Sequence, residues 1–336
     1  MKQVKIGLLG MGRIGKIHFR NIQQQFADAA VVAVADPLYD TGSFQKEYGD
    51  VFFSKDPLEV IHHPEVEAVL ICTPTSSHAG LLEAAIRSGK NIFCEKPMDL
   101  SLERTESLAA LAKLSGVKLM MGFNRRFDPD FLQAKQSVQA GVIGEVQIVK
   151  ITSRDPGLPP IDYIKNSGGL FVDMAIHDFD MARYIMNKKV VEVFAKGLVK
   201  VDPAVASAGD IDTALTTLSF DDGTYAVIDN SRQAVYGYDQ RLEIFGSGGM
   251  IQVDNNHYHR NVLFNASGIH HALPLGFFMD RYAQSYLNEM KFFIDALLED
   301  TALPVTGEDA LEATRIAFAA QLSVKEKRPV KVAEIG

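Results

Sequence analysis

Three side chains able to handle a proton lie in sequence contexts that suggest catalysis. Lys96 belongs to the run Cys-Glu-Lys-Pro at 94–97, which ends an apolar, strand-like stretch. Asp173 and His177 lie four residues apart in a stretch with helical periodicity, so their side chains share a face. A neutral imidazole can accept a hydroxyl proton, a carboxylate stabilises the resulting imidazolium, and a lysine can hydrogen-bond the reacting oxygen. The three residues therefore indicate acid–base chemistry on an alcohol.

Each of these residues also has a simpler interpretation. Lys96 by itself fits a solvated loop lysine, although a cis bond to the proline that follows would fix its direction. Asp173 and His177 fit a surface pair on a helix, and Asp180 and Tyr184 continue the same stripe. The pair would also suit a metal, but no third ligand is evident, so we expect no metal.

A glycine-rich loop near the N-terminus predicts the cofactor. The run Gly-Met-Gly-Arg-Ile-Gly at 10–15 follows an apolar strand pattern and opens a helical one. In such a loop Gly10 permits the turn, Gly12 lets a pyrophosphate approach the backbone, and Gly15 lets helix and strand pack closely. The first helical turn, which includes Arg13 and Ile14, offers its N–H groups to the phosphates. This context favours dinucleotide binding over an ordinary glycine turn.

Asp36 is the residue that selects among dinucleotides. It ends the second strand pattern, about 20 residues after the last glycine, where a ribose-binding acid is expected. Its carboxylate would accept hydrogen bonds from the ribose hydroxyls and repel a 2′-phosphate, and residues 37–40 contain no Arg or Lys to hold one. The sequence therefore favours NAD over NADP. FAD and dual use of NAD and NADP remain as alternatives.

The first part of the chain has the pattern of a sheet that could position these residues. Up to about residue 122, short runs rich in Val, Ile, Leu and Phe alternate with helical patterns, as in an α/β doubly wound parallel sheet. The expected strands cover 4–10, 31–36, 51–53, 66–73, 91–95 and 117–123, and two expected helices cover 77–88 and 101–114. We therefore expect an NAD-binding Rossmann domain over residues 1–122.

The pattern changes after residue 123, where hairpins replace the strand–helix alternation. The expected strands cover 145–155, 190–200, 213–220, 225–233, 240–245 and 250–254, with glycine-containing turns inside the last two pairs. A long helix is expected from 170 to 186, and a helix at 308–325 is expected to pack back on the first domain. We therefore expect a second α/β domain over 123–336, with a largely antiparallel sheet.

Composition excludes several classes of function. A chain of 336 residues suggests about two domains, and its net charge of −8 argues against nucleic acid as a partner. We find no signal-peptide pattern and no apolar run long enough to span a membrane. Both cysteines, Cys72 and Cys94, fall in apolar strand-like runs and fit structural burial better than redox chemistry. We therefore expect a cytoplasmic protein.

Taken together, these motifs resemble one known family. The glycine loop at 10–15, Glu-Lys-Pro at 95–97, Gly-Phe-Asn-Arg-Arg-Phe-Asp at 122–128 and the Gly-Gly…Asp…His helix at 168–177 resemble those of the Gfo/Idh/MocA oxidoreductases. The resemblance covers nearly the whole chain. The run at 122–128, with Ser-Arg-Asp-Pro at 153–156, is similar to the inositol dehydrogenase branch.

The resemblance implies a role for individual residues. His177 is implied as the base, Asp173 as its partner, and Lys96 as the group that binds the reacting oxygen. Beyond the glycine loop and Asp36, the implied cofactor contacts are Thr73, Pro74, His78, Glu95 and Lys96. The implied substrate contacts are Lys96, Asn124, Arg126, Asp155, Asp173, His177 and Tyr236, with Tyr238 as the alternative to Tyr236.

The resemblance also implies an activity and an assembly. It implies NAD-dependent oxidation of a ring hydroxyl of myo-inositol to 2-keto-myo-inositol, in inositol catabolism. Scyllo-inositol or another cyclic polyol or aldose is the alternative substrate, and a non-catalytic dinucleotide-binding regulator is a more distant alternative. The family's second domain has an open antiparallel sheet, through which a homotetramer or homodimer is implied.

Overall fold

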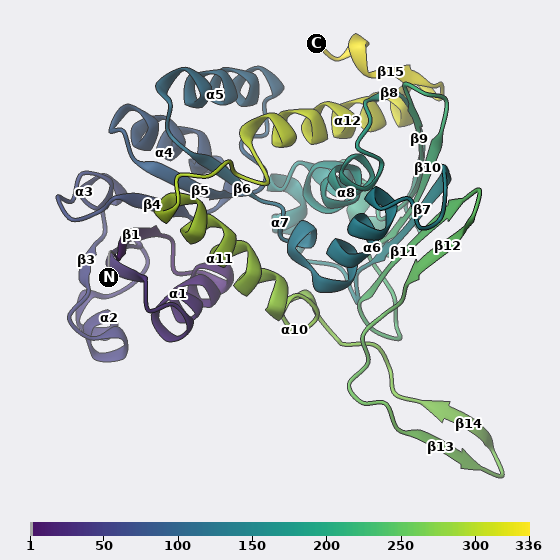
Figure 1. Ribbon diagram of the computed structural model, residues 1–336, viewed down its shortest axis with the longest axis horizontal. Helices are drawn as coiled ribbons and strands as arrows, with labels where there is room; N and C mark the ends of the chain where they lie inside the picture. The colour runs from purple at the N-terminus through teal and green to yellow at the C-terminus, as the bar shows by residue number, and fades with distance from the viewer. Residues whose placement is uncertain (1–2) are drawn as a thin grey trace. The chain divides into compact units, whose positions relative to one another are not determined.

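The computed structural model describes residues 3–336, which divide into two compact units (Figure 1). The first unit comprises Met1–Asn124 and Tyr286–Glu312, and the second comprises Arg125–Ser285 and Ala313–Gly336. The division after Asn124 lies close to the expected boundary at 122. However, the expected second domain is not continuous, because residues 286–312 group with the first unit.

The first unit is built on a six-stranded parallel sheet in the order β3-β2-β1-β4-β5-β6. The strands are β1 (Val4–Leu9), β2 (Ala29–Ala35), β3 (Phe52–Ser54), β4 (Ala68–Ile71), β5 (Asn91–Glu95) and β6 (Leu119–Gly122). β4 is buried along its whole length, and most residues of β1 and β2 are buried, because helices cover both faces of the sheet. The strand order reverses between β1 and β4, which is the topological switch point of a Rossmann fold. The predicted parallel sheet is confirmed.

Helices of the first unit lie on both faces of this sheet. In Figure 1, α4 and α5 lie on one side of β4 and β5, whereas α1 and α11 lie on the other. The helices are α1 (Arg13–Gln25), α2 (Thr41–Tyr48), α3 (Pro57–Ile61), α4 (Thr75–Arg87), α5 (Leu102–Ser115) and α11 (Ala283–Leu298), of which residues from Tyr286 onward belong to this unit. Several begin at a capping side chain, such as Ser101 before α5, which accepts a hydrogen bond from the N–H of Arg104.

The second unit is built on a seven-stranded sheet in the order β12-β11-β7-β10-β9-β8-β15. Its strands are β7 (Val146–Arg154), β8 (Val190–Leu198), β9 (Thr213–Phe220), β10 (Tyr225–Ser231), β11 (Asp239–Gly246), β12 (Gly249–Val253) and β15 (Val330–Lys331). Neighbouring strands are antiparallel except β7 and β10, which run parallel. The predicted, mainly antiparallel sheet is therefore confirmed, including both predicted hairpins.

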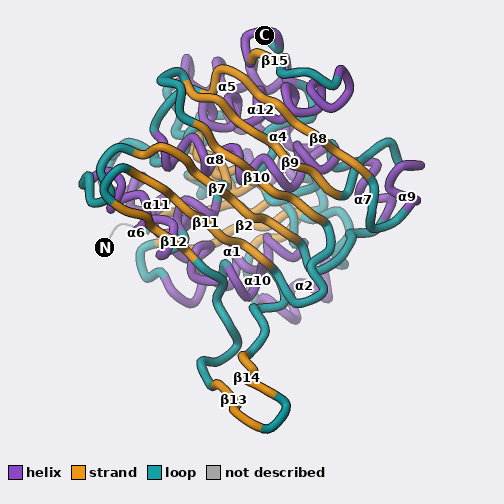
Figure 2. Tube along the Cα trace, turned by 90° about the vertical axis from the view of Figure 1, so that its right-hand side faces the viewer, coloured by secondary structure: helices purple, strands orange, loops and turns teal. Residues whose placement is uncertain are grey.

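Helices cover one face of this second sheet and leave the other open (Figures 1 and 2). They are α6 (Pro129–Gln139), α7 (Ile161–Asn166), α8 (Ile176–Met186), α9 (Pro203–Ser207), α10 (Phe278–Arg281) and the greater part of α12 (Gly307–Glu326). A separate hairpin, β13 (Val262–Asn265) and β14 (Gly268–His271), projects beyond β12. The one-sided cover explains why buried residues alternate with more exposed ones along β9.

Candidate active site

The glycine loop has the conformation that a dinucleotide site requires. Gly10 follows β1 with φ +92°, and a Cβ there would lie 2.8 Å from the carbonyl oxygen of Cys72. A side chain is therefore excluded by both the backbone angle and the close approach of the neighbouring chain. A Cβ at Gly15 would lie 1.9 Å from the carbonyl oxygen of Gly10, so the helix can pack this closely only with glycine.

The start of α1 fits the pyrophosphate of a dinucleotide. Gly12 precedes the helix in an extended conformation, and no side chain caps the first turn. A Cβ built at Gly12 would meet no atom within 4 Å, so the space next to this backbone is open. A helix N-terminus with open space beside it and no capping side chain suits an anionic phosphate group.

Asp36 joins the glycine loop to the second strand. Its carboxylate accepts hydrogen bonds from the N–H of Met11 at 2.7 Å and from the N–H of Leu38 at 2.8 Å. The remaining lone pairs can accept hydrogen bonds from ribose hydroxyls. The sequence analysis did not identify Lys16 of α1 as a cation of this region. Its Nζ lies 5.1 Å from the ring centre of Tyr39, three residues after Asp36. Hydrogen bonding to the Tyr39 hydroxyl, and next the charges around it, raises the pKa of Lys16.

His78 ties together two loops at the carboxyl edge of the sheet. It is buried, and its Nε2 lies 2.7 Å from the carbonyl oxygen of Thr73 while its Nδ1 lies 2.8 Å from that of Pro97. Both ring nitrogens are thus occupied by the backbone. His78 therefore joins the loop at Thr73–Pro74 to the loop at Lys96–Pro97, and its contact with the cofactor stays a prediction.

Glu95 lies in a buried cluster beneath the lysine loop. Its Oε1 lies 3.3 Å from Nε2 of His18, which in turn lies 3.9 Å from Oε1 of Glu289 on α11. Burial, and next the charge of Glu95, hold the pKa of Glu289 well above its usual range. Lys96 is half-buried, and the Lys96–Pro97 peptide bond is cis. The carboxylate of Glu95, the residue before Lys96, therefore has neighbours from both α1 and α11 within the first unit.

Both cysteines of the first unit are free thiols. Cys94 is buried and Cys72 is half-buried. Burial raises the pKa of both thiols well above the usual range, so neither is an activated nucleophile. Their arrangement agrees with the structural role that the sequence suggested.

In the second unit, the predicted helix at 170–186 contains a turn of π-helix. Residues Phe171–Ala175 form the π turn, and α8 continues from Ile176. Asp173 lies in the π turn and His177, half-buried, in the first turn of α8. The predicted single stripe is therefore interrupted, because a π turn holds more residues than an α turn. Such turns are frequent at functional sites.

Two residues that the sequence analysis did not identify hold Asp173. The hydroxyl of Tyr163 on α7 donates to Asp173 Oδ1 at 2.8 Å, and Nη2 of Arg232 donates to Oδ2 at 3.2 Å. Arg232 directly follows β10 and is 1% exposed, so its charge is almost fully desolvated. A carboxylate fixed from both oxygens in this way can orient a neighbouring imidazole.

Arg232 also lies close to two further carboxylates. Its Nη1 is 3.9 Å from Asp155 Oδ2, and its Nη2 is 4.0 Å from Asp210 Oδ2. Burial raises the pKa of Asp155 to about 6, with the charge of Arg232 opposing that change and the charge of Asp173 adding to it. The arrangement brings Asp155 and Asp173, both predicted substrate contacts, to the same guanidinium.

Asp210 explains the glycine pair before the helix. Its Oδ1 accepts a hydrogen bond from the N–H of Leu170 at 3.0 Å. A Cβ at Gly169 would lie 2.7 Å from the same oxygen, and Gly169 has φ +81°. Glycine is therefore required where Asp210 binds the start of the helix that carries Asp173 and His177.

The two adjacent arginines of the predicted substrate motif are buried in ion pairs. Arg126, the predicted substrate contact, donates from Nε and Nη2 to the two carboxylate oxygens of Asp180, and its guanidinium carbon lies 5.0 Å from the ring centre of Tyr184. Arg125 pairs with Asp178, which also accepts a hydrogen bond from Asn230 at 2.8 Å. Asp178, Asp180 and Tyr184 therefore anchor α8 through these arginines. Asp180 and Tyr184 thus contact Arg126, whereas Asp173 contacts Tyr163 and Arg232.

The remaining predicted contacts differ in their exposure. Asn124 is buried, and its Nδ2 has no hydrogen-bond partner among residues 3–336. The half-exposed hydroxyl of Tyr236 donates to Asp239 at 2.6 Å and accepts from Arg154 at 3.2 Å. Tyr238 is buried, and burial raises its pKa, with the charges of Arg125 and Asp155 also acting on it.

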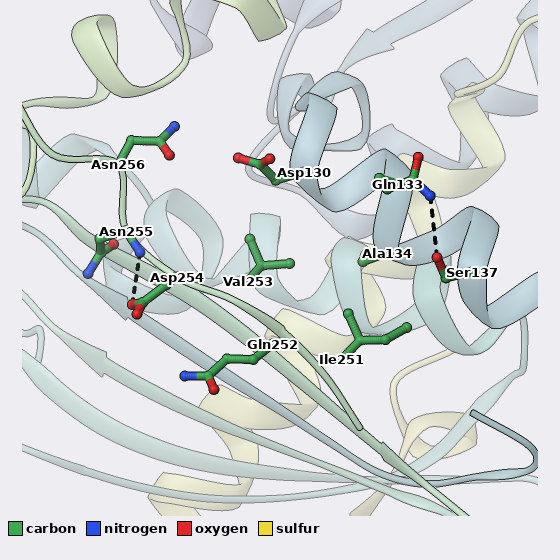
Figure 3. Close-up of a pocket in the computed structure, with 10 residues that line it drawn as sticks. All are labelled: Asp130, Gln133, Ala134, Ser137, Ile251, Gln252, Val253, Asp254, Asn255 and Asn256. Carbon is green, nitrogen blue, oxygen red and sulfur yellow. Dashed lines mark hydrogen bonds between the residues drawn. The ribbon is translucent and has the colours of Figure 1, made fainter. Parts of the chain in front are cut away.

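A cavity of about 380 Å³ lies elsewhere in the second unit (Figure 3). It is lined by Asp130, Gln133 and Ser137 of α6 on one side and by Ile251 and Gln252 of β12 on the other. None of its lining residues belongs to the predicted site.

No helix among residues 3–336 is long and apolar enough to cross a membrane.

Comparisons with protein families agree with the division of the chain into two units. Residues 4–123 match the model of an oxidoreductase family with an NAD-binding Rossmann fold, and residues 131–252 match a GFO/IDH/MocA C-terminal domain. The chain therefore belongs to the GFO/IDH/MocA family of NAD-binding oxidoreductases. The family prediction made from the motifs is confirmed.

Three individual relatives of the chain are named as dehydrogenases of inositols. A myo-inositol 2-dehydrogenase of Thermotoga maritima is 46% identical over 99% of each chain. An inositol 2-dehydrogenase of Rhizobium meliloti is 44% identical, covering 98% of this chain and 99% of the relative. The crystal structure of a Lactobacillus casei scyllo-inositol dehydrogenase with bound NAD(H) and scyllo-inositol is 32% identical, with a TM-score of 0.92 over 99% of this chain and 100% of that one.

Proposed function

We propose that the chain is an NAD-dependent dehydrogenase that oxidises one ring hydroxyl of myo-inositol to 2-keto-myo-inositol. The observation that carries the proposal is the fixed carboxylate of Asp173, held by Tyr163 and Arg232 four residues before His177. The relatives from Thermotoga maritima and Rhizobium meliloti support the substrate class.

Each of three residues has one role in the proposed reaction. His177 accepts the hydroxyl proton, Asp173 stabilises the imidazolium that forms, and Lys96 hydrogen-bonds the reacting oxygen as it becomes a carbonyl. Bound NAD⁺ supplies the oxidising power by accepting hydride from the ring carbon. The O–H and C–H bonds break, a C=O bond forms, and the proton leaves through His177.

The other assigned residues bind the two partners of the reaction. We assign the cofactor to the loop Gly10–Gly15, to Asp36 and to the edge formed by Thr73, Pro74 and Glu95, with His78 as a positioning residue. We assign substrate hydroxyls to Asn124, to Asp155 and to Tyr236, with Tyr238 as the alternative tyrosine. We assign Arg126 to holding α8, since Asp180 already occupies its guanidinium. We therefore assign NAD binding to the first unit and substrate binding to the second.

A second candidate substrate is scyllo-inositol. It is favoured by the structure from Lactobacillus casei, which holds scyllo-inositol and NAD(H) in a closely similar chain. The two isomers differ in the orientation of one hydroxyl, so the same acid–base residues serve either. Another cyclic polyol or an aldose belongs to the same class of reaction.

A substrate panel tests the proposal. Purified protein is mixed with NAD⁺ and, separately, with myo-inositol, scyllo-inositol, other cyclic polyols and aldoses, and NADH absorbance is followed. We expect the highest kcat/KM with myo-inositol. A higher kcat/KM with scyllo-inositol would select the second candidate. Tight NAD binding with no turnover of any polyol would favour a dinucleotide-binding regulator instead.

We also propose that the chain works as a homodimer or homotetramer in the cytoplasm, in the catabolism of inositol. The open sheet face supports assembly, because Tyr225, Ile148, Phe245 and Met250 lie directly opposite one another across four neighbouring strands and are each about half exposed. The free thiols of Cys72 and Cys94 support a reducing compartment. We assign no nucleic acid or membrane partner.

A further inference from the structure

Three side chains from distant parts of the sequence meet inside the first unit. His18 lies on α1, Glu95 ends β5 and Glu289 lies on α11. One ring nitrogen of His18 and one oxygen of each carboxylate all lie within 4.8 Å of one another. Nε2 of His18 lies 3.3 Å from Oε1 of Glu95 and 3.9 Å from Oε1 of Glu289. Both carboxylates therefore face the same imidazole nitrogen.

This cluster is almost completely shielded from water. The side chains of His18 and Glu289 are 0% exposed, and that of Glu95 is 15% exposed. The rings of Phe93 and Tyr286 meet the imidazole edge to face, with ring centres 5.1 Å and 5.8 Å away. Ionised groups are costly in such surroundings unless a partner of opposite charge compensates them. A cation between the two carboxylates would supply that compensation.

The carboxylate of Glu289 has its lone pairs unused. Neither of its oxygens has a hydrogen-bond partner among residues 3–336, and the same holds for Nδ1 of His18. The carboxylate of Glu95 packs closely on the neighbouring strand, because a Cβ at Gly122 would lie 2.9 Å from its Oε2. Glycine at 122 makes room for this carboxylate, and the backbone of Glu95 stays available to the cofactor edge assigned above. Glu289 is therefore a fully buried, unpartnered carboxylate that points into the cluster.

The kinds of atom in the cluster select the class of cation. With a neutral imidazole the two carboxylates carry two negative charges, which a divalent ion balances, whereas a proton on His18 would balance only one of them. One imidazole nitrogen and two carboxylate oxygens suit zinc and the neighbouring transition metals. Calcium and magnesium take oxygen ligands instead. The cluster therefore fits a divalent transition metal better than an alkaline-earth ion.

The distances also agree with such an ion. Tetrahedral bonds of about 2.0–2.2 Å separate the ligand atoms by about 3.3–3.6 Å. The 3.3 Å between His18 and Glu95 matches this spacing. The 3.9 Å between His18 and Glu289 is slightly longer, and a small rotation of the unpartnered Glu289 carboxylate would close the gap.

We propose that His18, Glu95 and Glu289 bind one divalent transition-metal ion, and that zinc fits the three ligands best. Three protein ligands leave the fourth position of a tetrahedron to water. The ion joins α11, which belongs to the segment that returns to the first unit, to α1 and β5, so its binding free energy adds to the stability of that unit. This site is independent of the dehydrogenase reaction proposed above and of Asp173 and His177, for which no metal is expected.

The test measures zinc binding by the full chain, purified without a histidine tag and stripped with EDTA. After incubation with zinc chloride and gel filtration, elemental analysis gives the zinc content, and calorimetric titration gives the affinity. We expect about one tightly bound zinc per wild-type chain and a higher Tm in zinc than in EDTA. Because the loss of an outer-shell partner alone costs about 10–100-fold in metal affinity, Glu289→Gln should lower the zinc affinity by at least about 100-fold.

A second variant and a control separate this site from zinc bound at the surface. His18→Asn should lose zinc as Glu289→Gln does. The matched control is His270→Asn/His271→Asn, which removes two exposed imidazoles of β14 that are able to bind zinc at the surface. This control should keep the affinity and the Tm increase of the wild type.

A measurement on the wild type does not depend on whether the variants fold. Cobalt(II) in place of zinc absorbs visible light strongly when its coordination is tetrahedral. We expect these bands without the near-ultraviolet bands that a thiolate ligand, from Cys72 or Cys94, would add. Circular dichroism in EDTA establishes separately that each variant folds.

Other outcomes would overturn the proposal. A wild type that retains no zinc and has the same Tm in zinc and in EDTA would do so. Zinc bound equally well by wild type and Glu289→Gln would be an adventitious ion only. Thiolate bands in the cobalt spectrum would place the ion on a cysteine, and an equal rise of Tm with calcium or magnesium would contradict the choice of a transition metal.

Discussion

The cofactor loop of the first unit and the Asp173 network of the second are built in different ways. The loop uses backbone atoms of consecutive residues, Gly10–Gly15, and requires little more than the absence of side chains. The network uses side chains, and Tyr163, Arg232 and Asp155 reach Asp173 or its partners from separate elements. The first kind of site tolerates change around it, whereas the second depends on every partner. Substitutions in the two regions test whether they differ in this way.

The largest effect is expected from the proposed reacting groups. His177→Asn and Lys96→Met should each lower kcat by about 10²–10⁴-fold, because a positioned proton acceptor or donor contributes about that much. The affinity for NAD should change little, because the loop binds through its backbone. Stopped-flow measurement of NADH formation, with NAD affinity from calorimetry, checks both parts. Unchanged turnover in either variant would remove that residue from the mechanism, and His257→Asn, at an exposed position, is the control.

Removal of Arg232 should have the next largest effect. Arg232→Ala leaves Asp155, Asp173 and Asp210 close together without their shared cation, and breaking such a buried pair costs about 3–5 kcal/mol of unfolding free energy. Chemical denaturation checks this value. The control is Lys291→Ala, since Lys291 is 61% exposed, its partner Asp295 is 35% exposed, and such a surface pair contributes about 1 kcal/mol or less. Equal losses for the two variants would contradict the idea that Arg232 organises the network.

Asp36 tests whether the cofactor loop also depends on a side chain. Asp36→Ala should weaken NAD binding by about 10–100-fold, because hydrogen bonds to a charged group contribute about 1.5–3 kcal/mol. NADP should gain affinity relative to NAD, since the repulsive carboxylate is gone and Lys16 remains near Tyr39. Fluorescence titration with both cofactors checks the ratio. Asp40→Ala, which removes only the cap of α2, should leave the ratio unchanged.

The smallest effect is expected from the pH dependence of the network. Because burial raises the pKa of Asp155 to about 6, its carboxylate takes up a proton as the pH falls below 6 and becomes a weaker acceptor for a substrate hydroxyl. We expect kcat/KM to fall several-fold between pH 7 and 5, and Asp155→Asn to remove that limb of the profile. A limb that persists in Asp155→Asn would belong to another group.

Linkage gives the opposite sign for stability at Asp155. The folded protein binds the proton more tightly than the unfolded chain, so the contribution of Asp155 to stability is greatest at low pH and is lost as the pH rises through about 6. Asp155→Asn should therefore unfold at a higher denaturant concentration than the wild type at pH 8, and this difference should shrink at pH 5. Denaturation at the two pH values checks the sign.

The sequence predicted those features that neighbouring residues determine. The glycine loop, the six parallel strands and both hairpins follow from local patterns, because a buried strand or a tight turn constrains the residues within it. Arg232 could not be predicted, since its neighbour Asp155 lies far away in the sequence and meets it only where β7 and β10 pair in parallel. The return of residues 286–312 to the first unit was missed for the same reason. The burial of Arg126 against Asp180 could not be predicted either, because Asp180 lies on a helix over 50 residues later.

The π turn at Phe171–Ala175 sets the rotational phase of everything that follows it on the helix. One residue corresponds to about 100° around an α-helix. Deleting a single residue from this turn would therefore rotate His177 and the anchors Asp178 and Asp180 away from their present directions together, whereas a substitution would change only one side chain. Chain length within this one turn, as well as residue identity, is thus a variable through which related proteins can redirect the base toward a different hydroxyl.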